Sequence, residues 1–422
     1  SPWLRDLAAR GGAVSVVHDP GHVPDAAALV VTAAVPKDPP EIAAARQAGI
    51  PVLKRAQALG AWVSRGTVVG IAGTHGKTTT TSMATEVLAA AGMDPTGLVG
   101  GHVVGWSGNL RFGSSELFVV EADEYDRSFL TLSPNVAVVT NLEADHLDIY
   151  GDLEGVRRSF LDFLAGVRGG GRVIVCADDP GASALLPAMG PSATTYGTAA
   201  GSMLRATDLV IEDGVTRANV WEEGRPAGTL SLTLGGRHNL LNALGAAAAA
   251  RALGARWDAI LPALASFAGV GRRFERVGEV DGVLVIDDYA HHPTELAAAL
   301  RATRALYPDR RVVAVFQPHL FSRTRDFARE FGEALSLADS LVVTDVFPAR
   351  EEPIPGVTGQ TIVDAATAAG ARDVTYVAAL DRVAAETRAL AREGDVVLTL
   401  GAGSIERVGA ALVQALQEAV HA

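Results

Sequence analysis

The amino-acid sequence predicts an α/β protein with mainly parallel sheets. Short β-branched runs alternate with Ala- and Leu-rich helical patterns almost throughout the 422 residues, as in strand–helix–strand units. Several of the apolar runs end in polar residues, which is typical of strands that reach a ligand-binding sheet edge. At roughly 100–200 residues per domain, the length suits about two to four domains, each with its own core.

The composition excludes several classes of protein. Hydrophobic residues make up 48% and charged residues 20%, which is a globular balance and argues against disorder. The net charge of −12 disfavours nonspecific binding to nucleic acid or to anionic membranes. No apolar run reaches the roughly 18 residues of a membrane helix, so we expect no membrane insertion. Neither composition nor pattern distinguishes a monomer from a homodimer.

The single cysteine, Cys176, excludes an intrachain disulfide framework and fits a reducing cytoplasm. It follows an apolar run and is expected to be a small buried hydrophobic residue. The first residues show no basic segment followed by an apolar core, so no signal peptide is expected, and we predict a cytoplasmic location.

The chain divides into three predicted domains. Residues 1–64 are too short for a complete domain, and their predicted elements are a helix at 3–10, a strand at 29–32, a helix at 41–48 and a strand at 52–53. Residues 65–271 begin with a strand at 67–71 and include an antiparallel part, predicted from the turn pairs Asp213-Gly214 and Glu223-Gly224. Residues 272–422 alternate strand and helix again, after a predicted hinge at 269–271.

A glycine loop follows the strand at 67–71. The sequence Gly73-Thr74-His75-Gly76-Lys77-Thr78 precedes a helix predicted from about Thr78 to Ala91. Backbone N–H groups at such a junction bind phosphate oxygens, while the lysine neutralises the β- and γ-phosphates and the threonine holds Mg²⁺. The general motif has a glycine six residues before the lysine, where this chain has Ile71. The alternative is a glycine turn that only caps the helix.

Two further strands predict ionisable groups at the same sheet edge. Residues 117–120 lead into the acidic run 121–126, and residues 136–140 lead into 141–146, which ends in His146. Carboxylate oxygens beside an ATP loop suit Mg²⁺, and His146 would act on a second ion or through water. The alternatives are a solvated loop for the acidic run and a hydrogen-bonded structural role for His146.

The third section predicts a second polar edge. Its strands at 283–286, 312–316, 341–344 and 396–400 all end in polar or glycine-rich loops. Arg323 and Arg325 are candidates for a carboxylate or phosphate clamp. The alternatives are a surface ion-pair network for the arginines and helix capping or packing for His291 and His292. Two such edges joined by a hinge are expected to close over the substrates and exclude water.

Taken together, these motifs resemble the Mur ligases of peptidoglycan synthesis, in particular the alanine-adding branch. The resemblance covers nearly the whole chain. Its motifs are residues 73–80, "EADEYDRSF" (121–129), "TNLEADHLDIY" (140–150), "GRHNLLN" (236–242), "GRRFE" (271–275), "DDYAHHPTE" (287–295), 317–326 and "AREEPIPGV" (349–357).

The resemblance implies a three-domain ligase: an N-terminal domain for the UDP part, a central ATP-binding domain and a C-terminal Rossmann-like domain for the amino acid. The implied substrates are UDP-N-acetylmuramate, L-alanine and ATP, with Mg²⁺ or Mn²⁺ as the metal. ATP would phosphorylate the lactyl carboxylate, and the amine of L-alanine would then displace phosphate. Cations are needed because anionic groups must be brought together.

The resemblance also implies residue roles. The implied catalytic residues are Lys77, Glu121, His146, Arg273, His291 and Arg323, and the implied metal ligands are Thr78, Glu121 and His146. The ATP-binding residues are Gly73, Thr74, His75, Gly76, Lys77, Thr78, Thr79, His238, Asn239, Asn242 and Asp288. The residues implied to bind the other substrates are Gly100, Gly101, His102, Asn109, Tyr289, His319 and Arg325.

The chain departs from the family pattern at three places. No lysine lies between His146 and Cys176, so no carbamylated lysine is predicted. Leu320 stands where the family usually has an arginine, so one cationic contact is missing or is replaced by Arg323 and Arg325. The sequence starts at Ser1-Pro2-Trp3, after the glycine-rich loop with which the family begins, so the N-terminal domain is expected to be truncated and to bind UDP-sugar poorly.

Two other readings stay open at this point. A recycling ligase would add a ready-made tripeptide to the same UDP-sugar, although the stretches at 316–325 and 349–357 disfavour it. In a different class, a P-loop kinase or a nucleotide-dependent binding module would need no amine substrate.

Overall fold

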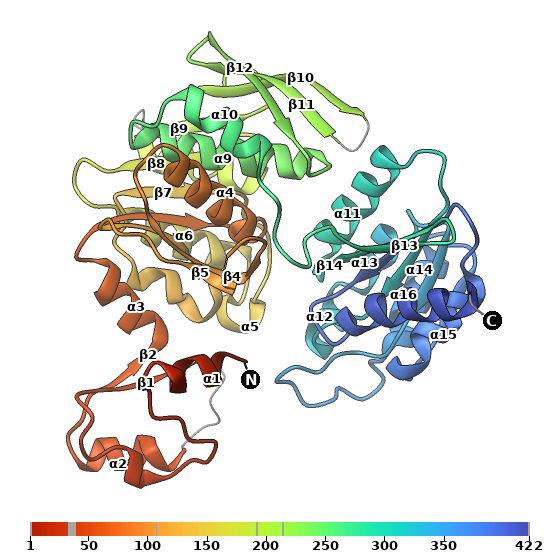
Figure 1. The fold of residues 1–422 in the computed structure, drawn as a ribbon, viewed down its shortest axis with the longest axis horizontal. Coiled ribbons are helices and arrows are strands. Elements are labelled where there is room, and N and C mark those ends of the chain that lie inside the picture. Colours follow the sequence, from red (N-terminus) through yellow and green to blue (C-terminus); the bar gives the residue numbers. More distant parts are fainter. Residues whose placement is uncertain (1, 33–38, 107, 191–192, 213–214, 421–422) are drawn as a thin grey trace.

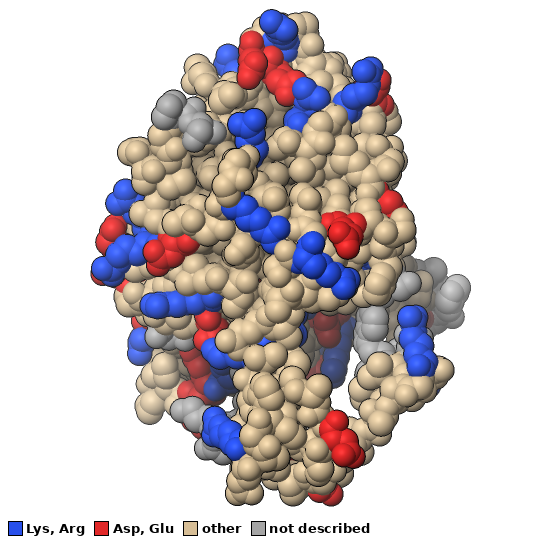
Figure 2. All heavy atoms as spheres, turned by 90° about the vertical axis from the view of Figure 1, so that its left-hand side faces the viewer, with Lys and Arg blue, Asp and Glu red and all other residues tan. Residues whose placement is uncertain are grey.

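The structure is a computed structural model that describes residues 2–32, 39–106, 108–190, 193–212 and 215–420 (Figure 1). It has the predicted α/β fold, with three sheets that follow one another along the chain. The described helices include none that is long and apolar enough to cross a membrane. On the face shown in Figure 2, the described Lys and Arg side chains are interspersed with Asp and Glu, as on an ordinary globular surface.

The N-terminal part contains a two-stranded parallel sheet, β1–β2. It lies below the large central part in Figure 1, and α3 connects the two. The predicted helices and strands of this part are present to within one or two residues. The elements are α1 Pro2–Ala9, η1 Pro20–His22, β1 Leu29–Val31, α2 Pro40–Gln47, β2 Val52–Lys54 and α3 Arg55–Val63.

The central sheet has ten described strands in the order β12-β11-β10-β9-β8-β7-β3-β6-β4-β5. It is parallel from β10 to β4 and antiparallel at its two ends. The strands are β3 Thr67–Ala72, β4 Thr96–Val103, β5 Gly108–Arg111, β6 Leu117–Glu121, β7 Val136–Val139, β8 Arg172–Cys176, β9 Thr194–Gly197, β10 Leu204–Glu212, β11 Val215–Glu222 and β12 Arg225–Leu232.

Helices cover both faces of this sheet, which is why β3 is buried almost along its whole length. Val69 and Ile71 point into the core with α4, α9 and α10, whereas Val68 and Ala72 point into the core with α6. The helices are α4 Lys77–Ala90, η2 Tyr125–Thr131, α5 Leu147–Tyr150, α6 Leu153–Ala165, α7 Pro180–Ser183, α8 Leu186–Met189, α9 Arg237–Ala252 and α10 Trp257–Ala265.

The C-terminal sheet has the described order β13-β14-β18-β15-β16-β17 and is parallel except for the pair β13–β14. One face packs against α11, α13 and α14, and the other against α15 and α16. The elements are β13 Glu275–Val280, β14 Val283–Asp288, α11 Pro293–Leu306, β15 Val312–Phe316, α12 Phe321–Asp326, α13 Ala328–Leu335, β16 Ser340–Val343, α14 Gly359–Ala368, β17 Val374–Tyr376, α15 Leu380–Leu390, β18 Val396–Leu400 and α16 Glu406–Val420.

The antiparallel part predicted from the turn pairs is present as β10, β11 and β12. Glu223 and Gly224 join β11 to β12 with φ angles of 49° and 76°. Two positive φ angles in a two-residue connection are the signature of a type I′ hairpin. The other turn pair, Asp213-Gly214, lies outside the described residues.

The predicted hinge segment crosses from the central sheet to the C-terminal one. Gly271 N–H donates to the carbonyl of His102 at 2.7 Å, and Tyr289 N–H donates to the carbonyl of Arg272 at 2.7 Å. Arg272 and Phe274 both have left-handed backbones, with φ of 59° and 56°. The segment is therefore fastened to β4 on one side and to the loop after β14 on the other.

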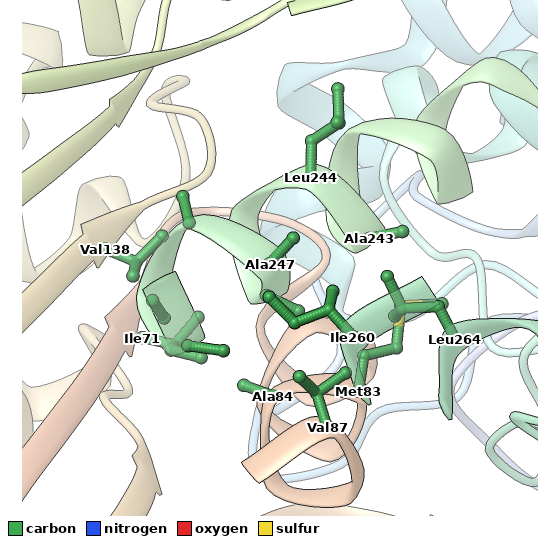
Figure 3. Close-up of a cluster of buried hydrophobic side chains, with 14 of the residues drawn as sticks. Ile71, Met83, Ala84, Val87, Val138, Ala243, Leu244, Ala247, Ile260 and Leu264 are labelled. Atoms are coloured by element: carbon green, nitrogen blue, oxygen red, sulfur yellow. The ribbon is translucent and has the colours of Figure 1, made fainter. Parts of the chain in front are cut away.

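Helix α9 packs closely on α4 because its buried side chains are small. Ala243 and Ala247 lie among Met83, Val87 and Ile260 in the core (Figure 3). This close packing matters for the site, because it brings Asn242 of α9 next to Gly76 of the glycine loop.

We predict that Ala247→Leu destabilises the central part of the protein. Ala247 is 1% exposed, so a leucine has no free space and should cost about 1–3 kcal/mol of unfolding free energy. Urea unfolding measures the change. The control is Ala385→Leu at an exposed position of α15, which should shift the transition little. Equal shifts for both variants would contradict the packing argument.

Candidate functional site

The glycine loop lies between two other polar strand ends. Strand β3 is paired with β7 on one side and β6 on the other, all parallel. The loop after β3, the acidic run after β6 and the stretch after β7 therefore meet at one edge of the sheet. This is the convergence that the sequence predicted.

Two glycines are required by the shape of the loop. Gly73 has φ 145°, and a Cβ there would lie 1.9 Å from Thr140 Oγ1. Gly76 has φ 78°, and its Cβ would lie 2.4 Å from Asn242 Oδ1 on α9. Any side chain at these positions would push the loop away from β7 or from α9.

The loop is held by residues that follow β7. His75 N–H donates to Asn141 Oδ1 at 2.7 Å, and Asn141 Nδ2 donates to the carbonyl of His75 at 3.0 Å. Glu143 N–H donates to Thr74 Oγ1 at 2.9 Å. The loop is thus fixed before any ligand arrives, as a phosphate-binding loop has to be.

Lys77 points back over the loop. Its Nζ donates to the carbonyls of Gly73 and Thr74 at 2.6 and 3.0 Å and pairs with Glu124 at 2.8 Å. Burial raises the pKa of Glu124 to about 7, although the ammonium group of Lys77 acts in the opposite direction. The ammonium group is therefore held at the loop mouth, where phosphate oxygens can replace the carbonyls.

Thr78 and Glu121 form the predicted pair of hard oxygen ligands. The Thr78 hydroxyl lies 3.0 Å from both carboxylate oxygens of Glu121. Glu121 Oε2 also accepts from Gly100 N–H at 2.6 Å. A hydroxyl beside a carboxylate fits Mg²⁺, which prefers such ligands and keeps several waters.

His146 lines the same cavity as Thr78 and Glu121 but makes different contacts. Its Nε2 lies 3.7 Å from Asp145 Oδ2 and 3.9 Å from Glu124 Oε1. Burial lowers its pKa, which keeps the imidazole neutral and able to ligate a metal. The surroundings suit a second cation next to Glu124, separate from the Thr78–Glu121 pair.

A cavity of about 630 Å³, called the main cavity below, lies between the central and C-terminal parts. It collects most of the predicted catalytic and substrate-binding residues. They are Lys77, Thr78, Gly100, Gly101, His102, Glu121, His146, Arg273, Tyr289 and His291. Asn109 lies instead in an adjoining pocket of about 220 Å³, which shares Gly100 and Glu121 with the main cavity.

A second pocket, of about 220 Å³, extends from the loop along α9. It contains predicted ATP residues, namely His75, Gly76, Thr79, His238, Asn239, Asn242 and Asp288. Asn242 bonds to Thr80 and Asn239, and Asn239 bonds to the carbonyl of Gly235. Cys176 and Tyr196 also line this pocket, together with Asp178 and Arg237.

A histidine–glutamate cluster, consisting of His75, Glu143, His292 and Glu295, joins the loop to α11. His75 Nδ1 lies 3.1 Å from Glu295 Oε1, and its Nε2 lies 3.5 Å from Glu143 Oε2. Burial alone would lower the pKa of His75, but the two carboxylates raise it to about 9. His292 caps α11 by accepting from Thr294 N–H, which confirms the capping alternative, and burial lowers its pKa to about 4.

Arg323 makes a second contact between the two parts. Its Nη2 donates to Asp145 Oδ1 at 2.6 Å, and its side chain is 5% exposed. The same Asp145 oxygen accepts from His146 N–H at 2.8 Å, where the backbone is left-handed with φ 52°. Arg323 and the His146 backbone therefore share one Asp145 oxygen, so Arg323 helps to hold His146 in place.

The other predicted arginines differ in their surroundings. Arg325 is exposed and pairs with its neighbour Asp326, and it lines a separate pocket of about 270 Å³ with Leu320 and Arg323. This corresponds to the surface ion-pair alternative. Arg273 lies over the Tyr289 ring at 5.1 Å and 3.8 Å from Glu295, inside the main cavity.

Family models match the chain in three ranges. The model for the "Mur ligase middle domain" matches residues 71–250, the "Mur ligase, glutamate ligase domain" matches 272–403, and the "Mur ligase family, catalytic domain" matches 1–67. UDP-N-acetylmuramate–L-alanine ligase of Paenarthrobacter aurescens (strain TC1) is 47% identical, over 98% of this chain and 90% of the relative. The chain belongs to the Mur ligase family.

Solved structures of Mur ligases have the same fold. The UDP-N-acetylmuramate-alanine ligase from Thermotoga maritima has a TM-score of 0.81 and 29% identity, over 98% of this chain and 90% of that chain. The murein peptide ligase from Psychrobacter arcticus 273-4 has a TM-score of 0.69 and 25% identity over the same shares. Mur ligases are ATP-dependent enzymes that form amide bonds, and this chain is an enzyme of that class.

Local sequence patterns do not single out several residues of this Mur ligase site. They are Glu124, Asn141, Glu143, Asp145 and Glu295, which pair with or position the predicted residues. All of them lie inside motifs that were recognised at 121–129, 140–150 and 287–295. The motifs marked the right segments, but only the fold shows which members of each segment face one another.

We predict that the pH dependence of stability in this Mur ligase reflects His75. The pKa of His75 is about 9 in the folded protein and about 6.5 for an unperturbed imidazole. The stabilisation is therefore fully present below about pH 6.5 and is lost as the pH rises through about 9. Urea unfolding between these pH values should show a steeper loss of stability for wild type than for His75→Gln.

The matched control is His18→Gln, which removes an exposed histidine from the N-terminal part. This variant should change the slope less than His75→Gln does, because the contact of His18 with Glu41 is exposed to water. A His75→Gln slope equal to that of wild type would contradict the assignment of a charged His75 to the histidine–glutamate cluster.

Proposed function

We propose that this Mur ligase joins L-alanine to the lactyl carboxylate of UDP-N-acetylmuramate in peptidoglycan precursor synthesis, with ATP converted to ADP and phosphate. The observation that carries the proposal is the 47% identity, over 98% of the chain, to an enzyme named for this reaction. Among the solved structures, the alanine ligase of Thermotoga maritima has a TM-score of 0.81 and the murein peptide ligase of Psychrobacter arcticus 273-4 has a TM-score of 0.69. We place the reaction in the cytoplasm, where ATP is available.

ATP binds along α9 with its phosphates on the glycine loop. The pocket of about 220 Å³ beside His238, Asn239 and Asn242 reaches the glycine loop, since His75 and Gly76 also line it. Backbone N–H groups of Gly76 to Thr79 begin α4 and point to the phosphate position, where the positive end of the helix dipole adds to the attraction. Lys77 exchanges its bonds to the loop carbonyls for bonds to the phosphates.

The main cavity brings the carboxylate of the sugar substrate to the γ-phosphate. A carboxylate is a poor acyl donor, so one of its oxygens attacks the γ-phosphorus and ADP leaves. The resulting acyl phosphate has phosphate as its leaving group. Gly100, Gly101, His102 and Arg273 all line this cavity, and the arginine adds positive charge where the anions meet.

The amine of L-alanine then attacks the acyl carbon from the side of the C-terminal part. The new N–C bond gives a tetrahedral intermediate, the nitrogen passes its extra proton to water, and phosphate leaves with the electrons of the C–O bond. His291 lines the cavity, with its Nδ1 3.0 Å from the carbonyl of Tyr289 and 3.1 Å from Glu295. Its position supports a role in orienting the amine.

Thr78 and Glu121 would hold one Mg²⁺, and His146 would contribute to a second metal position, with Mn²⁺ as a substitute. The metal supplies positive charge to the phosphate oxygens when it is bound. Arg323 keeps His146 in place through Asp145. These assignments rest on the donor types and on their shared cavity.

We propose the division into domains at 1–64, 65–271 and 272–422. Each range contains one of the three sheets, and the family models match 1–67, 71–250 and 272–403. The C-terminal range is the amino-acid domain in this proposal, and the N-terminal range takes part in binding the UDP moiety.

The function predicts phosphate release that depends on both substrates. With ATP, Mg²⁺ and UDP-N-acetylmuramate, adding L-alanine should start steady phosphate release and produce UDP-N-acetylmuramoyl-L-alanine, detected by mass spectrometry. Release without any amine would favour a kinase. Release with the tripeptide but not with L-alanine would favour the recycling ligase.

We predict that Glu121→Gln weakens the use of Mg²⁺. The amide keeps the size of the side chain but removes the charge that faces Thr78, so the half-saturating Mg²⁺ concentration should rise by about tenfold or more. Titration of phosphate release with Mg²⁺ measures it. Asp258→Asn, an exposed carboxylate on α10, is the control and should titrate like wild type. An unchanged requirement in Glu121→Gln would move the metal to Asp123 or Glu124.

A further inference from the structure

The main cavity contains one arginine that lacks an acidic partner. Among the described residues that line this cavity, Lys77 pairs with Glu124, Arg272 with Asp287, and Arg273 lies near Glu295. Arg350, an exposed residue, also lines it and forms no ion pair with another described residue; its guanidinium lies over the ring of Tyr125 at 4.5 Å. A cation without a counter-charge at a cavity wall is available for an anionic ligand.

Arg350 belongs to the C-terminal part and faces the central one. It lies on the loop after β16, whereas Tyr125 follows β6 and contacts the His146 ring edge-on at 5.1 Å. Arg350 is therefore next to the predicted second metal position and on the side from which the amino acid enters. The nearest acidic neighbour in sequence, Glu351, is bonded to Ser322 instead and leaves Arg350 free.

The loop of Arg350 is fastened to the segment that contains Leu320. Leu320 N–H donates to the carbonyl of Phe347 at 2.9 Å, and Phe347 N–H donates to the carbonyl of Pro318 at 2.8 Å. Leu320 itself is buried and offers no charge. The sequence predicts either a missing cationic contact at this leucine or its replacement by Arg323 and Arg325; both arginines are paired and line a separate pocket.

His319, which lies near Arg350, adds no positive charge to this part of the cleft. Burial, together with His291, Arg323 and Arg350, lowers the pKa of His319 to about 3. The His319 ring packs on Phe347 and edge-on against His291. His319 is thus a neutral hydrogen-bonding group, flanked by two cations: Arg323, which is paired with Asp145, and Arg350.

We infer that Arg350 binds the α-carboxylate of the incoming amino acid and so aims its amine at the acyl phosphate. In an α-amino acid one carbon separates the carboxylate from the nitrogen, so an anchor for the carboxylate fixes where the amine lies. A guanidinium suits this role because it binds a carboxylate through two parallel hydrogen bonds. The inference rests on the proposed function, since it names a residue for the second substrate.

The test compares L-alanine with L-alaninamide, which has the same amine and methyl group but no carboxylate. Phosphate release is measured with ATP and UDP-N-acetylmuramate for wild type, Arg350→Ala and Arg350→Lys. Arg350→Ala should raise the KM for L-alanine by about tenfold or more, with the KM values for ATP and UDP-N-acetylmuramate within about twofold. Its kcat/KM for L-alaninamide should equal that of wild type.

Arg350→Lys should lie between wild type and Arg350→Ala, because lysine keeps the charge but not the paired hydrogen bonds. The control is Arg329→Ala, an exposed arginine on α13 that pairs with Glu330 and Glu333, and it should behave as wild type. An unchanged KM for L-alanine in Arg350→Ala, or equal losses with L-alanine and L-alaninamide, would overturn the inference. Absence of L-alanine-dependent release in wild type would refute the proposed function itself.

Discussion

The pairing of β3 between β7 and β6 is the constraint on which the site depends. Since all three strands are parallel, their polar ends must share one edge. The glycine loop then has Asn141 on one side and Glu121 on the other, and its backbone is bonded before a nucleotide binds. Helix α9 can support the loop from a third side because its inner face is alanine and because Gly76 leaves room for Asn242.

The sequence predicted the parts of the molecule in which local pattern decides the structure. Apolar runs followed by polar residues located β3, β6, β7 and four strands of the C-terminal sheet, β14, β15, β16 and β18, within a residue or two, but not β13 or β17. The same pattern placed Glu121 and His146 beside the glycine loop, because the edge of a parallel sheet is a consequence of strand direction. The hairpin at Glu223-Gly224 was predictable for a similar reason, since few residues tolerate two positive φ angles.

Side-chain contacts between segments that are far apart in the sequence could not be predicted from local pattern. Nothing in the local pattern shows that Lys77 pairs with Glu124 while Glu121 bonds to Thr78. Arg323 is a plausible substrate clamp in the sequence, but its position in the fold brings it to Asp145, 178 residues earlier in the chain. Which residues pair depends on how the central and C-terminal parts pack together, and the local sequence does not determine that packing.

Pairing charged groups across the cleft costs free energy, because these groups lose bound water. His75, Glu295, Asp145 and Arg323 come from opposite walls and are mostly removed from water where they meet. Opening would return four ionic groups to solvent, and closing would strip their water again. The attraction within each pair offsets the loss of water, so these contacts add little net stability. Their main effect is to fix how the two walls of the cleft meet.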